Sequence, residues 1–64
     1  MLITDILVGL IGDPVRIFMN SGDEFTGIVL DVSDDNVRLI TEGGKLIALL
    51  LQFVSSVQEP QPVL

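Results

Sequence analysis

The sequence predicts a mainly β domain in which a short N-terminal helix precedes a strongly bent, five-stranded small barrel. Three observations predict this fold. Apolar side chains recur at every second position through most of the chain, and clusters of Gly, Asn, Asp and Ser separate the alternating runs. With 64 residues, the chain is too short for two large packed sheets, so a small barrel fits best. We expect a single domain over residues 1–58, followed by a flexible, Pro-containing tail at 59–64.

The first segment, residues 1–12, has the pattern of a short helix. Its apolar stripe follows the i, i+3, i+4 spacing and consists of Ile3, Ile6, Leu7, Leu10 and Ile11. Thr4 and Asp5 are the predicted caps, and Gly12 with Pro14 predicts the end of the helix. Because so short a helix is marginal in water, we expect it to dock on the sheet.

The next two segments predict a hairpin of strands at Val15–Asn20 and Glu24–Val32. Residues alternate between two faces in both, and Gly22 lies in the turn between them, where a positive φ is needed. Gly27 interrupts the second strand. A glycine inside a strand marks a sharp bend or a close backbone contact, so Gly27 is the predicted bend of the sheet.

Three further strands are predicted at Val37–Thr41, Lys45–Leu51 and Val54–Val57. A tight turn containing Gly43 and Gly44 joins the first two, and a single 3₁₀ turn at Gln52–Phe53 precedes the last.

The acidic stretch before the third strand has two interpretations. Carboxylate and amide oxygens of Asp31, Asp34, Asp35 and Asn36 could serve as ligands for Ca²⁺ or Mg²⁺. The alternating ligands, central glycine and distal glutamate of an EF-hand loop are missing, however. We therefore interpret the stretch as a hairpin turn, and we predict neither a metal site nor a cofactor.

Composition argues against several classes of function. The net charge is −6, and Arg16, Arg38 and Lys45 are the three basic residues, which makes nucleic acid an unlikely partner. Cys and His are absent, and the serine and threonine hydroxyls lack a suitable base, so we do not expect an enzyme. The longest uncharged stretch has 13 residues against the roughly 20 of a membrane helix. No basic leader precedes Asp5, and we expect a cytoplasmic protein without membrane contact.

The apolar segment Leu46–Val54 predicts self-association. Alternation places Leu and Ile side chains on both of its faces, whereas a monomeric barrel would leave one face in water. Burial of such a side chain is worth about 1.5–3 kcal/mol. We predict a homo-oligomer with an interface formed by Ile47, Leu49, Leu51, Phe53 and Val54. A monomer whose N-terminal helix covers the second face, and assembly with a different small protein, are the alternatives.

Residues 15–41, VRIFMNSGDEFTGIVLDVSDDNVRLIT, resemble the first motif of the Sm-like small barrels. The shared features are the apolar alternation, the turn Gly22, the bend Gly27, and Asp and Asn residues ahead of an apolar strand. The resemblance implies an N-terminal helix on a five-stranded barrel, and rings in which the fourth strand of one subunit pairs with the fifth of the next. The ending LLLQFVSSV looks like that of short bacterial Sm-like or SH3-like barrel proteins.

The resemblance also implies an alternative function, RNA binding through Asn36 with Arg38 and Lys45 as its cations. Two departures argue against it. Gly27 and Asn36 are one residue closer together than the corresponding pair in RNA-binding members. Residues 45–57, KLIALLLQFVSSV, contain neither the Ile-Arg-Gly segment of the second Sm motif nor the Lys-His pair of the Hfq branch. We therefore favour a structural, scaffolding or protein-interaction module that assembles with itself in a ring.

Overall fold

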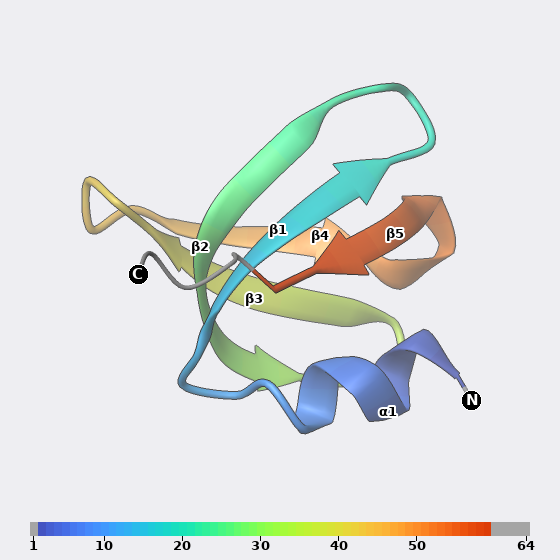
Figure 1. Ribbon diagram of the computed structural model, residues 1–64, viewed down its shortest axis with the longest axis horizontal. Coiled ribbons are helices and arrows are strands. Elements are labelled where there is room, and N and C mark those ends of the chain that lie inside the picture. The colour runs from blue at the N-terminus through green and yellow to red at the C-terminus, as the bar shows by residue number, and fades with distance from the viewer. Residues whose placement is uncertain (1, 60–64) are drawn as a thin grey trace.

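The computed structural model describes residues 2–59 (Figure 1), and the bounds of its five strands lie within one residue of the predicted ones. Over these residues the chain is mainly β, with one short helix and five antiparallel strands, as predicted. The predicted tail lies outside the described residues except for Glu59. The elements are α1 (Ile3–Val8), β1 (Pro14–Met19), β2 (Glu24–Val32), β3 (Asn36–Thr41), β4 (Leu46–Leu50), the 3₁₀ turn η1 (Leu51–Phe53) and β5 (Val54–Gln58).

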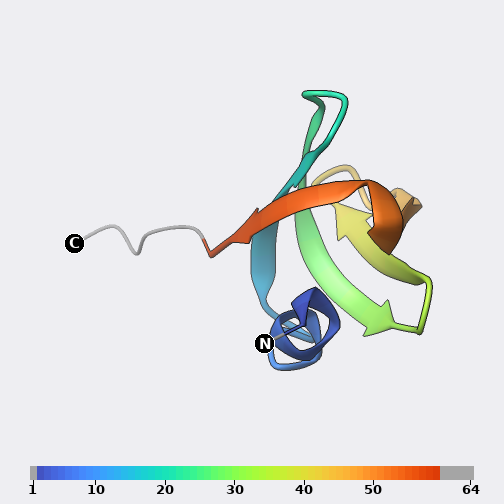
Figure 2. The same ribbon diagram turned by 90° about the vertical axis from the view of Figure 1, so that its right-hand side faces the viewer.

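The strands form a single antiparallel sheet within the described part of the chain, in the order β4-β3-β2-β1-β5. Consecutive hairpins join β1 to β4, and β5 returns to pair with β1. Figure 2 shows the long strand β2 curving through the molecule with α1 at one end of the sheet. Within residues 2–59 no hydrogen-bonded pairing joins β4 to β5, so the sheet has two edges.

Gly27, the predicted bend of the sheet, lies opposite Thr41 of β3 and Val15 of β1. A Cβ atom at this position would lie 2.7 Å from the carbonyl oxygen of Ile40. That oxygen belongs to the backbone of the paired strand and cannot rotate away. Glycine is therefore required here because two strands approach closely.

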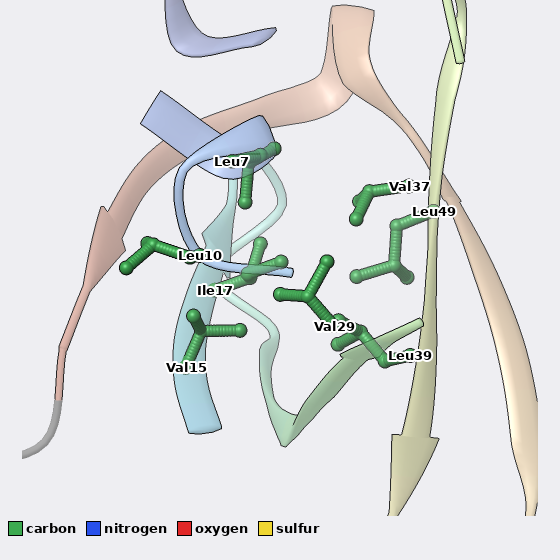
Figure 3. Packing of buried hydrophobic residues seen from close by; sticks show 8 residues of the cluster. All are labelled: Leu7, Leu10, Val15, Ile17, Val29, Val37, Leu39 and Leu49. Atoms are coloured by element: carbon green, nitrogen blue, oxygen red, sulfur yellow. The ribbon is translucent and has the colours of Figure 1, made fainter. Parts of the chain in front are cut away.

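Buried side chains of α1, of the turn that follows it and of β1 to β4 form the core (Figure 3). Figure 3 shows most of these side chains gathered between α1 and the strands, with Leu10 at one side of the cluster. Period-2 alternation explains which residues of β1 take part, since Val15 and Ile17 are fully buried while Arg16 between them is exposed. The core residues are Leu7, Leu10, Val15, Ile17, Val29, Val37, Leu39 and Leu49.

The helix differs from its prediction in length and capping. It covers six residues, Leu2 occupies the N-cap position, and within the described chain no side-chain hydrogen bond caps it. The prediction of Thr4 and Asp5 as caps is therefore wrong, although Asp5 lies in the first turn, where its charge favours the helix dipole. Leu7 of the helix and Leu10 just after it are buried in the core, and α1 packs mainly against β2 and β5.

Candidate assembly edges

The outer edge of β4 presents backbone groups of three residues. Thr41 N donates to Lys45 O over 2.9 Å at one end of the β3–β4 ladder, and Leu51 N donates to Asp35 O over 2.9 Å at the other. Both end pairs are hydrogen-bonded, and in an antiparallel ladder every second pair between them is hydrogen-bonded as well. Ile47, opposite Leu39, and Leu49, opposite Val37, therefore direct their backbone groups toward β3. The N–H and C=O groups of Leu46, Ala48 and Leu50 point away from β3, toward the free edge.

The outer edge of β5 follows from the bonds made by β1. Met19 N donates to Asp23 O on the β2 side over 2.8 Å, and the next residue, Asn20, donates its N–H to Phe53 O over 2.8 Å on the β5 side. Since successive residues alternate, the backbone groups of Ile17 point toward β2. Val57, which lies opposite Ile17, therefore directs its own N–H and C=O away from β1.

Neither edge is protected by charge or by proline, although both strands are short and β5 has a bulge at Ser55. Natural sheets protect exposed edges with charged side chains, with proline or with a covering loop. The stretch from Leu46 to Gln58, which contains β4, η1 and β5, has neither a charged residue nor a proline. Two unprotected edges at opposite ends of one strand order are complementary, because each can supply the pairing that the other lacks.

An apolar hollow of about 380 Å³ lies beside the β4 edge, between β4, η1 and the turn of the β1–β2 hairpin. Phe53 is 50 % exposed at this hollow, and Leu50 on its rim is 45 % exposed. A strand added to β4 would cover both side chains. The lining residues are Met19, Asn20, Ser21, Asp23, Phe25, Ala48, Leu49, Leu50 and Phe53.

The predicted interface side chains lie at different depths in the single chain. Leu49, one of the predicted interface residues, is only 7 % exposed and belongs to the core. Ile47, Leu51 and Val54 are half-buried and pack against the same core, whereas Phe53 is exposed. The exposed aliphatic side chains of β4 are instead Leu46 and Leu50, which α1 does not cover.

A signal in the sequence could have identified the exposed face of β4. The tight turn after Thr41 sets the register that places Arg38 opposite Ala48. A charged residue in the middle of β3 marks the solvent side, so Ala48 and its alternate neighbours must share that side. The alternation within β4 alone does not identify the solvent-facing side, because both faces of that strand are apolar.

The three residues of the predicted RNA contact do not gather at one place. Asn36 donates from its amide to Asp35 Oδ1 over 2.9 Å. Arg38 lies on β3 and donates from Nε to Asp31 Oδ1 over 2.8 Å and from Nη2 to Asp31 Oδ2. Lys45 lies at the opposite end of the β3–β4 hairpin, and within residues 2–59 it forms no ion pair.

The Arg38–Asp31 pair is exposed and changes the acid–base behaviour of both groups. The hydrogen bonds from Arg38 lower the pKa of the Asp31 carboxyl below its ordinary value, and the adjacent positive charge acts in the same direction. The same bonds raise the pKa of Arg38. Arg16 likewise pairs with Glu24, at 2.9 Å between Nε and Oε2. Two of the chain's three cations are thus matched with carboxylates of the same molecule.

The acidic stretch forms a hairpin turn between β2 and β3. Ser33 N donates to Asn36 O over 2.8 Å, which closes the turn, and the Ser33 hydroxyl donates to Asp35 Oδ1 over 3.3 Å. Among residues 2–59 no group of three or more acidic side chains is arranged to hold a metal ion. The side chains of Ser33, Asp35 and Asn36 form hydrogen bonds within the turn itself.

Neither a family model nor a curated protein matches the chain. In the described part of the molecule, no helix is both long and apolar enough to cross a membrane.

Proposed function

We propose that this chain is an Sm-like small barrel that assembles with copies of itself, in a ring, and acts as a non-enzymatic scaffolding or protein-interaction unit. The observation that carries the proposal is the pair of unprotected edges, β4 and β5, at the two ends of a strand order β4-β3-β2-β1-β5. The resemblance of residues 15–41 to the first Sm motif and the bend at Gly27 support the same fold.

Pairing of β4 of one copy with β5 of the next is a head-to-tail contact between two different surfaces. An open row of copies would keep a free β4 edge at one end and a free β5 edge at the other, and these two edges pair only when the row closes into a ring. The backbone groups of Leu46, Ala48 and Leu50 then acquire partners, and the exposed surface of Leu50 and Phe53 is removed from water.

Charge determines where copies can meet. Each copy carries a net charge of −6, and like charges brought together oppose association. The uncharged stretch from Leu46 to Gln58 brings no acidic side chain of its own to the paired edges. The engagement of Arg16 and Arg38 with carboxylates of the same chain supports assembly over RNA binding, which depends on cations that are available to phosphates.

The proposal is tested by the particle mass of the Ala48→Pro variant. The Ala48 N–H points to the free edge, so proline removes an edge donor without removing a bond to β3, and proline is tolerated at edge positions. Ala48→Thr is the matched control, because it also enlarges the exposed side chain but keeps the N–H. We expect light scattering after size exclusion to give fewer subunits per particle for Ala48→Pro than for the wild type or Ala48→Thr. Equal masses for the three proteins would exclude the β4 edge as the contact.

A further inference from the structure

A row of aliphatic side chains crosses the outer face of the sheet. Ile28 of β2, Ile40 of β3 and Leu46 of β4 lie directly opposite one another in the register of the three strands. They are 48 %, 37 % and 51 % exposed. Pro14 of β1 extends the row beyond Ile28, and a shallow, largely apolar hollow of about 370 Å³ runs along this end of it.

The row is distinct from the edges that pair in the proposed ring. Edge pairing uses the backbone groups of β4 and β5, which lie in the plane of the sheet. The side chains of Ile28 and Ile40 project out of that plane on two interior strands. Pairing at the β4 edge would therefore leave Ile28 and Ile40 in water.

The charges on and beside this face cancel, unlike those of the whole chain. Glu24, Asp31 and Glu42 contribute −3, and Arg16, Arg38 and Lys45 contribute +3, so the sum is zero against −6 for the molecule. Asp31 and Arg38 form an ion pair next to the row, while Glu42 lines the hollow and Lys45 precedes Leu46. The excess negative charge consequently lies elsewhere on the chain.

We infer that the outer face of β2, β3 and β4 is a second self-association surface, on which another copy of this chain docks face to face. A twofold contact requires a patch that is complementary to itself. An apolar row flanked by equal numbers of positive and negative groups meets this requirement, because each Arg38 can approach an Asp31 across the axis. A strongly basic partner would find little electrostatic attraction on a face with no net charge. A second copy, which is acidic, meets less electrostatic repulsion on this face than elsewhere on the molecule.

The test compares Ile28→Lys with Val8→Lys by light scattering across a wide range of protein concentration. Both variants add one positive charge at an aliphatic residue of similar exposure, 48 % for Ile28 and 51 % for Val8, but Val8 lies on α1. We expect Ile28→Lys to halve the particle mass and Val8→Lys to keep it. Matching thermal melting curves would show that both variants are folded. Equal particle masses for the two folded variants would overturn the inference.

Combination with Ala48→Pro separates this surface from the ring contact. If both surfaces exist, Ala48→Pro alone leaves particles of two copies, and the further change Ile28→Lys converts them to single copies. If the β4 edge is not a contact, Ala48→Pro has no effect while Ile28→Lys still halves the mass. Two-copy particles that persist in the Ala48→Pro, Ile28→Lys double variant would overturn the face-to-face contact.

A charge reversal gives a second, independent test. Arg38→Asp changes the sum of the six charges from zero to −2, and the additional change Asp31→Arg returns it to zero. We expect the single variant to lose the face-to-face contact and the double variant to recover it. A single variant that keeps the wild-type mass would contradict the role of charge balance.

Discussion

Replacement of Gly27 by alanine tests the close approach of β2 and β3 at the bend of the sheet. The added Cβ would lie 2.7 Å from the Ile40 carbonyl oxygen, 3.1 Å from the Ile40 carbonyl carbon and 3.3 Å from Leu39 Cβ. Two of these atoms belong to the backbone of β3, and Leu39 is fully buried, so the neighbours can move only if the strands separate.

The expected magnitude follows from two opposing effects. Overpacking of this kind costs about 1–3 kcal/mol. Removal of a glycine from a strand returns about 0.5–1 kcal/mol. The midpoints of the two ranges leave a net loss of about 1 kcal/mol in the free energy of unfolding for Gly27→Ala, which corresponds to a fall in Tm of roughly 4–8 °C for a domain of this size.

Gly43→Ala is the matched control for this experiment. Among the described residues no atom lies within 4 Å of a Cβ built at Gly43, and its φ is not positive. Alanine should therefore leave stability unchanged or raise it by about 0.4–1 kcal/mol. Thermal unfolding followed by circular dichroism, at one fixed protein concentration because association also stabilises the fold, measures both variants. A Tm for Gly27→Ala equal to that of Gly43→Ala would refute the close approach of the strands.

Two further predictions concern β4 and the ion pair on the outer face. Leu49→Ala should destabilise the single chain by about 2–5 kcal/mol, because this side chain is buried in the core. Leu50→Ala, at a half-exposed position, should cost less than about 1.5 kcal/mol. Urea unfolding of both variants in the Ala48→Pro background measures these losses, and equal losses would contradict the assignment of Leu49 to the inner face and Leu50 to the outer face of β4. Because Arg38 lowers the pKa of Asp31 below 3.8, this carboxyl contributes stability above pH 3.8 that is lost as the pH falls through the lowered value. Asp31→Asn should therefore show a smaller loss of Tm on acidification than the wild type, by a margin that salt reduces, and an identical acid profile would exclude a contribution from the pair.

The sequence predicts the elements of this fold well because each has a local cause. Alternation defines the strands, and residues such as Gly22, with a φ of 96°, mark the turns. The close backbone approach at Gly27 could also be predicted, since a glycine inside an otherwise regular strand marks a bend or a close contact.

The inward face of an apolar strand could not be predicted in this way. Leu49 and Leu50 are the same residue type at adjacent positions, yet one is in the core and the other is half-exposed. The choice depends on the register with β3, which is a tertiary property. In β2, likewise, Val29 is buried while its neighbour Ile28 is exposed.

The ion pair between Arg38 and Asp31 could not be predicted from the local sequence pattern either. Regular pairing from Val29 opposite Leu39 would place Leu30 opposite Arg38. The strand instead has a bulge after Val29, which shifts the register and brings Asp31 opposite Arg38. One extra residue thus converts a contact between an arginine and an aliphatic side chain into a salt bridge on the outer face.

The most direct test of the account is the mass of the wild-type protein in solution, compared with that of Ala48→Pro under the same conditions. A single chain has a mass of 6.9 kDa. We predict that the wild type forms particles of several chains and that Ala48→Pro forms smaller ones. Wild-type particles of 6.9 kDa at every concentration would contradict self-assembly through the edges of β4 and β5.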